Sequence, residues 1–168
     1  LAYFKRYGQT PEGNPTQGNK AGGLTTLADK SLGCIQKGGK AVISGIVACG
    51  DRIVVPGFNL VAGPGNDLAG VTAQVAAGSV LTIFTTGRGT PCGFIGPTFR
   101  LATNNELFNK KKSWNDFNAG RMLNGEKAED LADELFDDII ATCEGRYRTM
   151  NERNEFYSIG IFKDGVLD

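Results

Sequence analysis

The residues of this sequence that are best suited to chemistry lie in "TTGRGTPCG", residues 85–93, a glycine-rich turn that follows an apolar run. Its glycines allow backbone N–H groups to turn toward a ligand, and the guanidinium of Arg88 can bind a carboxylate through two parallel hydrogen bonds. The alternative is a tight turn that leaves Arg88 in solvent. We predict an anion-binding loop whose residues are Thr85, Thr86, Gly87, Arg88, Gly89 and Thr90.

The cysteine of the same turn, Cys92, is a weak candidate for a nucleophile. The sequence contains no histidine, so no imidazole is present to act as its base. A packed thiol or a metal ligand fits Cys92 better. Neither this turn nor the earlier "GPGND" has the third glycine of a dinucleotide-binding fingerprint at the required spacing.

The turn "GPGND", residues 63–67, offers the oxygen atoms of Asn66 and Asp67 to a cation. The alternative for Asp67 is the N-cap of the helix that follows, and we favour that alternative. Asp116 and Asn118 lie on a later turn and carry the same ambiguity.

A sheet is needed to position these turns, and the hydrophobic pattern predicts one. The predicted strands are 40–50, 58–62, 79–84, 98–103 and 157–165, and the predicted helices are 25–35, 68–77, 104–112 and 128–145. A continuous apolar strand such as 79–84 is typical of a parallel sheet buried on both faces. Ligands bind beyond the carboxyl ends of such strands, where both turns lie.

We therefore predict an α/β fold with a mainly parallel sheet and flanking helices. A single domain would span residues 1–168, with a loop-rich first segment at 1–39 that includes a long loop at 8–23. Trp114 and Phe136 are predicted core residues.

The composition excludes several classes of protein. Lys plus Arg and Asp plus Glu are each 18, and the zero net charge argues against nucleic acid and against an anionic membrane surface. No apolar run approaches the roughly 20 residues that span a bilayer. The four cysteines are widely separated, which predicts reduced thiols in a cytoplasmic protein.

Several long stretches carry a family resemblance: "GNPTQGNKAGGLTTLADKSLGCIQKGG", "GNDLAGVTAQVAAGSVLTIFTTGRGTPCGF", "PTFRLATNNELF", "WNDFNAG" and "YSIGIFKDGV". Together they resemble the C-terminal part of the altronate/galactarate dehydratase family, whose similarity also extends to a sulfolactate sulfo-lyase branch. The resemblance implies a metal-dependent hydro-lyase that converts a sugar acid into a 2-keto-3-deoxy acid. It also implies a Rossmann-like sheet within a larger domain, with Fe²⁺ as the metal and Mg²⁺ or Mn²⁺ as alternatives.

Members of the family are larger proteins, so we expect this chain to be a fragment that works with an N-terminal part and forms a homo-oligomer. In the implied reaction the Arg88 loop would bind the carboxylate of the sugar acid. Asn66, Asp67 and Cys92 are the candidate metal ligands, and Lys20 and Lys37 are candidates for a base or a carboxylate clamp. Two alternatives remain open: a non-catalytic α/β module, and a phosphate- or nucleotide-binding domain.

Overall fold

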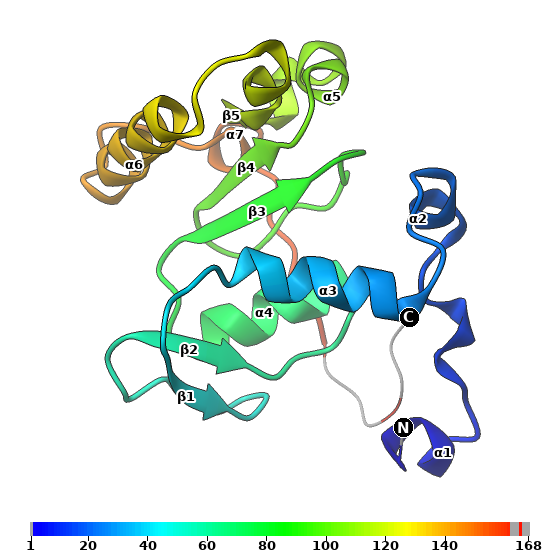
Figure 1. Cartoon of the computed structure of the whole chain (residues 1–168). Coiled ribbons are helices and arrows are strands. Elements are labelled where there is room, and N and C mark those ends of the chain that lie inside the picture. The colour runs from blue at the N-terminus through cyan, green and yellow to red at the C-terminus, as the bar shows by residue number, and fades with distance from the viewer. Residues whose placement is uncertain (1, 162–164, 166–168) are drawn as a thin grey trace.

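The structure, a computed structural model, describes residues 2–161 and 165 of the chain. Its first part holds three short or medium helices and a pair of strands (Figure 1): α1 (Ala2–Arg6), α2 (Gln17–Ala21), α3 (Leu27–Lys37), β1 (Ile43–Val47) and β2 (Phe58–Val61), with a 3₁₀ turn η1 (Pro11–Gly13). The strands β1 and β2 are parallel and form a sheet of their own.

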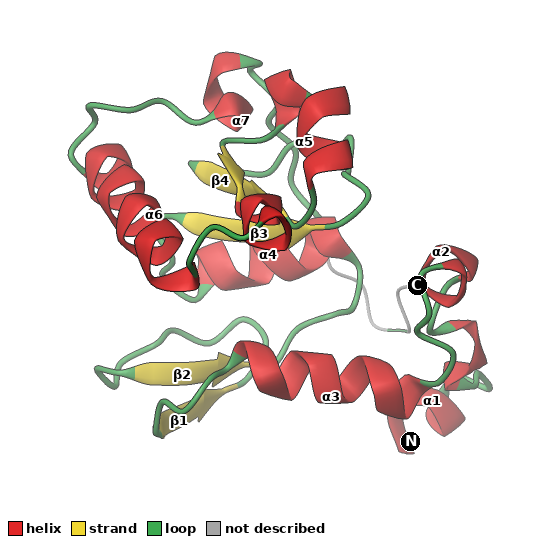
Figure 2. Cartoon of the chain, turned by 45° about the horizontal axis from the view of Figure 1, so that its top comes forward, coloured by secondary structure: helices red, strands yellow, loops and turns green. Residues whose placement is uncertain are grey.

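The second part holds a three-stranded parallel sheet with strand order β3-β4-β5. Its helices and strands are α4 (Asp67–Ala76), β3 (Thr82–Thr86), β4 (Thr98–Ala102), α5 (Asn105–Lys110), β5 (Phe117–Asn118), α6 (Ala128–Cys143) and α7 (Met150–Arg153), with 3₁₀ turns η2 (Lys112–Trp114) and η3 (Ala119–Asn124). Figure 2 shows α4 between the two groups of strands.

Local signals set the ends of α3 and the C-terminal end of α4. The hydroxyl of Thr26 accepts a hydrogen bond from the Asp29 backbone at the start of α3, and the Asp29 carboxylate accepts one from the Thr26 backbone. The same helix ends at Gly38, and Gly78 follows the end of α4 with a φ of +117°.

The hydrophobic core lies between the second sheet and α6. All five residues of β4 are buried. The core cluster consists of Phe99, Leu101, Phe117 and Leu131, with Leu81, Ala119, Leu135 and Tyr147 packed against it. Because Leu131 and Leu135 place one stripe of α6 on this core, the next residue along, Phe136, points elsewhere and is 62% exposed. The prediction of Phe136 as core is therefore wrong, and Trp114 is only half-buried.

The α/β class and the parallel strands are confirmed, but three expectations need correction. The described strands form two sheets rather than one. The predicted loop at 8–23 contains η1 and α2. The predicted last strand is not a strand over 157–161, and its residues 162–164 lie outside the described part of the chain.

The segment 157–161 bonds to a helix instead of a strand edge. The backbone N–H of Gly160 donates to the Thr72 hydroxyl of α4 at 2.9 Å. A side chain on Gly160 would meet the backbone of Ala69, at 2.7 Å from its Cα. These contacts place the segment against α4 rather than beside a strand.

Burial divides the described chain into two regions. Residues 16–68 contain no buried residue, whereas residues 69–151 contain every buried residue except Pro15. Within the described residues, no helix is both long enough and apolar enough to cross a bilayer.

Candidate anion-binding site

The glycine-rich turn leaves the carboxyl end of β3 and is fixed by the end of the neighbouring strand. Gly89 has a φ of +84°, which only glycine adopts readily, and its N–H donates to the Thr86 hydroxyl at 2.9 Å. The Thr103 hydroxyl donates to the Thr86 carbonyl at 3.2 Å, and the Asn104 amide donates to the Gly87 carbonyl at 2.8 Å. The turn is therefore held in one conformation by protein hydrogen bonds.

Arg88, at the tip of this turn, contacts α2. Its Nη1 donates to the Gly18 carbonyl at 3.2 Å, and a Cβ on Gly18 would lie 2.8 Å from that nitrogen. Lys20 follows two residues later on the same helix, α2. The structure thus joins α2, the helix of the predicted Lys20, to the Arg88 turn across 70 residues of sequence, although Lys20 itself does not line the pocket beside Arg88.

Lys37 lies apart from this pair. It is the last residue of α3, an 11-residue helix, which places it about 15 Å along the axis from Leu27 at the other end. The opposite end of α3 is the one near α2, because Lys30 donates to Asn14 at 2.6 Å and to Asn19 at 3.2 Å. The two predicted lysines therefore do not converge on one site.

A pocket of about 470 Å³ opens beside Arg88. Its lining residues come from the turn and from α5 and its ends: Gly87, Arg88, Asn104, Glu106, Leu107, Lys110 and Lys111. Three cationic side chains face one carboxylate, so the pocket carries an excess of positive charge. The Lys111 ammonium also lies 3.9 Å from the centre of the Trp114 ring.

Lys110 and Lys111 are pocket residues that were not predicted from the sequence. The run "NKKK", residues 109–112, was a visible signal, but it predicts equally well a solvated helix end. The position of α5 beside the turn, through Asn104, is what makes the lysines part of the pocket.

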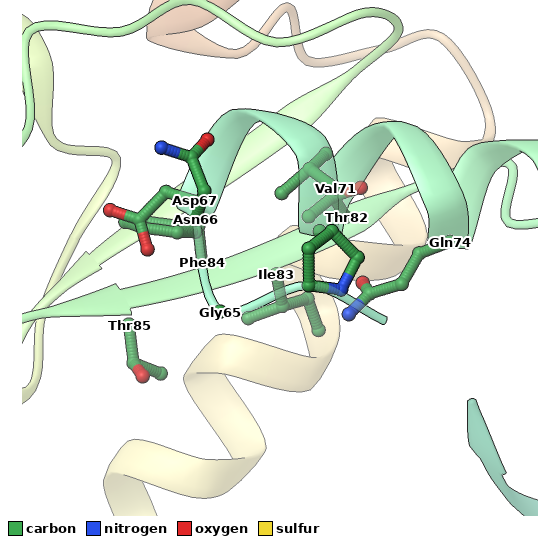
Figure 3. A pocket seen from close by; sticks show the side chains of 11 residues that line it. Gly65, Asn66, Asp67, Val71, Gln74, Thr82, Ile83, Phe84 and Thr85 are labelled. Carbon is green, nitrogen blue, oxygen red and sulfur yellow. The ribbon is translucent and has the colours of Figure 1, made fainter. Parts of the chain in front are cut away.

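A second pocket, of about 260 Å³, lies on the side of β3 that faces α4 (Figure 3). Asn66, Asp67 and Thr85 gather at one end of it, and Gln74 lies at the other. The Asn66 side chain accepts a hydrogen bond from the Ala69 backbone at 3.2 Å, so Asn66 is the N-cap of α4. The prediction of Asp67 as N-cap is wrong; Asp67 is the first residue of the helix, where its negative charge is favoured by the helix dipole.

The predicted anion loop is thus divided between two pockets. Thr85 lines the pocket that holds Asp67, whereas Gly87 and Arg88 line the basic pocket. The Thr86 hydroxyl is occupied within the turn, and the Thr90 carbonyl accepts a hydrogen bond from Arg100 at 3.0 Å.

Arg100, a residue of β4 that is 2% exposed, fixes the chain beyond the turn. Its guanidinium donates to the carbonyls of Thr90 and Cys92 and lies 5.6 Å from the centre of the Phe94 ring. Burial lowers the pKa of Arg100, and nearby Asp116 opposes that shift. Cys92 is a free cysteine whose backbone, at least, has this structural role.

Asp116, which the sequence left open between a cation ligand and a structural residue, accepts hydrogen bonds within the fold. Its carboxylate accepts hydrogen bonds from the Arg100 backbone at 2.7 Å, the Met150 backbone at 2.7 Å and the Tyr147 hydroxyl at 3.0 Å. Burial nevertheless raises the pKa of Asp116 above its ordinary value, and burial together with Asp116 raises the pKa of Tyr147. Asp116 thereby joins β4 to α7.

The candidate metal ligands do not come together as one set. Cys92 is not among the residues that line the Asp67 pocket, and the Asn66 amide oxygen caps α4. Across the part of the chain that the structure describes, no three His, Cys, Asp or Glu side chains are grouped closely enough to hold a metal ion. Of the three candidate ligands, Asp67 is the one whose carboxylate lines this pocket.

Comparisons with known proteins decide the family. The sequence model described as "D-galactarate/Altronate dehydratase, C-terminal" matches residues 1–167. The chain belongs to this family. It is 47% identical over 164 residues to altronate dehydratase of Escherichia coli K12, which covers 98% of this chain and 33% of that protein.

Other relatives carry different names. Galactarate dehydratase (L-threo-forming) of Escherichia coli K12 is 38% identical, over 83% of this chain and 27% of that protein. The (2R)-sulfolactate sulfo-lyase subunit beta of Chromohalobacter salexigens is 31% identical, over 81% of this chain and 36% of that protein. The chain spans about a third of the length of the curated relatives that it matches.

Proposed function

We propose that this chain is the C-terminal part of a hydro-lyase that removes water from a sugar acid of the altronate or galactarate type, giving a 2-keto-3-deoxy acid. The family match and the dehydratase names of its relatives support the reaction class. The observation that carries the site is the basic pocket at the carboxyl end of β3, where Arg88, Lys110 and Lys111 surround a space of about 470 Å³.

The chemistry of dehydration explains why such a pocket is needed. A base must take the proton next to the substrate carboxylate, positive charge or donors must stabilise the enediolate that develops, and an acid must protonate the departing hydroxyl. Arg88 binds the carboxylate and stabilises its growing charge. Lys20, on the helix that Arg88 contacts, acts as a second carboxylate contact or as the base.

A divalent cation, with Fe²⁺ first and Mg²⁺ or Mn²⁺ as alternatives, stays a prediction. When bound, such a cation would add positive charge at the enediolate. Asp67 is the residue here that would contact it, and the remaining ligands would come from outside the described residues. The roles given to Arg88 and Lys20 do not depend on it.

The test removes the charge of Arg88 in an enzyme that contains all parts of the site. This chain replaces the matched third of Escherichia coli altronate dehydratase, and turnover of altronate and galactarate is measured. Arg88→Ala should lower kcat/KM by about tenfold or more, because a charge-assisted hydrogen bond contributes roughly 1.5–3 kcal/mol. Lys112→Ala is the matched control, since Lys112 neighbours Lys111 but does not line the pocket. A change of less than about threefold for Arg88→Ala would reject Arg88 as the carboxylate ligand.

The same assay distinguishes the roles of Lys20 and Lys37. Lys20→Ala should impair turnover, as a rise in KM if Lys20 binds the carboxylate and as a fall in kcat if it is the base. Lys37→Ala is the comparison, because Lys37 lies at the far end of α3. An equal loss from both substitutions would contradict the assignment of Lys20 from its place on the helix that Arg88 contacts.

The sulfo-lyase alternative rests on the 31% identical relative. A sulfonate, like a carboxylate, is an anion that arginine and lysine bind. Turnover of (2R)-sulfolactate, with none of either sugar acid, would favour this alternative. A non-catalytic role for the chain would leave all of these activities unaffected by substitutions in the basic pocket.

A further inference from the structure

The region of residues 27–60 exposes an unusual set of large apolar side chains. We call six of them the apolar set: Leu32, Ile35, Val42, Ile46, Val54 and Leu60, from α3, the β1–β2 pair and the segments beside it. Ile46 is 81% exposed and Val54 is 84% exposed. No residue of α3 is buried either, although its apolar positions give it an amphipathic pattern.

The β1–β2 pair is the part of this region that most needs a partner. The two strands are parallel and form a sheet with no third strand among the described residues. Ile46 lies opposite Leu60 in the register, so this cross-strand apolar pair faces outward from one surface of the sheet. Parallel sheets occur almost only with both faces covered, and two strands alone are not stable in water. Such a pair with an exposed face therefore needs further strands or a covering layer.

We propose that the apolar set and the free edge of the β1–β2 pair dock the polypeptide that, in the longer relatives, precedes the third matched by this chain. That polypeptide would add parallel strands to the pair and cover its open face with apolar side chains. The inference deepens the proposed function, since it names the surface through which this chain joins the rest of a dehydratase.

Two observations favour this occupant over a second copy of the chain. The family match is to the C-terminal part, and the matched relatives have about two thirds of their length outside it. In addition, a symmetric dimer through the face of the pair would cover one surface and leave the strand edge and α3 open. A longer polypeptide can add strands at the edge of the pair and also cover its exposed face.

The experiment compares amide hydrogen exchange in this chain alone and in the chimera in which it replaces the matched third of Escherichia coli altronate dehydratase. Residues 43–47 and 58–61 should exchange at least about tenfold more slowly in the chimera, while β4 stays protected in both. Ile46→Arg should remove most of that gain in the chimera without changing the exchange of β4 in the chain alone. Leu123→Arg is the matched control, because Leu123 is 75% exposed but lies on η3 in the other region.

The possible results distinguish a failure of the docking surface from a failure of the proposed function. Equal exchange of β1 and β2 in the two proteins, or no effect of Ile46→Arg on the chimera, would overturn it. Protection that appears in the chain alone as its concentration rises, together with dimers in sedimentation, would overturn it in favour of a second copy. A chimera with protected strands and no activity on any of the acids would reject the proposed function alone, and an active chimera with unprotected strands would reject the docking surface alone. The measurement can be repeated with the unmatched two thirds of Escherichia coli altronate dehydratase added as a separate polypeptide, so that the two parts are not covalently linked.

Discussion

Strands β1 and β4 have similarly apolar sequences, but they differ in how far they are buried. The sequence of β1, "ISGIV", is at least as apolar as that of β4, "TFRLA", and both lie in parallel pairs. Yet β4 is buried at all five positions, whereas no residue of β1 is. The apolar character of a strand predicts that it must be covered, but it does not say which part of a protein covers it. In residues 69–151 the cover is α6 and its neighbours; in residues 16–68 it is absent from the described chain.

The largest expected effect is a core truncation in the second region. Phe99 is fully buried in the cluster with Leu101, Phe117 and Leu131. Phe99→Ala should lower the free energy of unfolding by about 3–5 kcal/mol, because it removes buried surface and leaves a cavity. Urea denaturation followed by circular dichroism measures this loss.

The matched substitution in the first region is Ile46→Ala. Because Ile46 is 81% exposed in the chain alone, the free energy of unfolding should change by less than about 0.5 kcal/mol. A loss of stability similar to that of Phe99→Ala would show that residues 16–68 already have a core in this chain.

The next effect concerns the segment that follows the Arg88 turn. Asn151 is 1% exposed; it accepts a hydrogen bond from the Phe94 backbone and donates to the Phe94 carbonyl at 3.1 Å. Asn151→Ala should cost about 1–3 kcal/mol in unfolding free energy, because buried backbone groups lose their partner. Asn124→Ala, at an exposed position of η3, serves as the control. Equal stability of the two variants would mean that residues 90–97 are not held from α7.

The smallest effect is a pH dependence from Asp116. Burial raises its pKa above the ordinary value of 3.8. Between the ordinary and the raised value the folded state binds more protons than the unfolded state, so stability from this group falls as pH rises through that window. Asp116→Asn removes the titration, and the stability of the variant relative to the native chain should therefore rise from about pH 4 upward until the window ends.

Thermal unfolding of both proteins at a series of pH values measures this difference. Asp133→Asn, on the exposed face of α6, controls for the removal of one carboxylate. A relative stability that falls as pH rises would contradict the raised pKa, and it would mean that the three hydrogen bonds to Asp116 outweigh its burial.

The sequence predicts well what local signals determine. The predicted helices at 68–77 and 128–145 are found as α4 (Asp67–Ala76) and α6 (Ala128–Cys143), and the stripe of Leu131 and Leu135 on α6 lies on the core. The segment 157–161 was mispredicted because its β-branched residues indicate a strand, while a close contact between Gly160 and Ala69 determines its place. No short-range pattern contains such a contact.

In the candidate site, too, the features set by local sequence could be predicted and those set by long-range contacts could not. Arg88 and its turn were predicted, because a glycine-rich loop after an apolar strand is a local feature. The contact of Arg88 with Gly18 and the arrival of Lys110 and Lys111 at the same pocket join segments far apart in the sequence. Buried Arg100 carried no local signal either, since an arginine in a strand is usually predicted to be exposed.

Residue-resolved hydrogen exchange of this chain alone, comparing β1 with β4, tests directly whether only the second region has a core. We expect the amides of β4 to exchange only with global unfolding, and those of β1 to exchange at least about a hundredfold faster because residues 16–68 lack a core of their own. Protection of β1 within about threefold of β4 in the dilute monomer would contradict it.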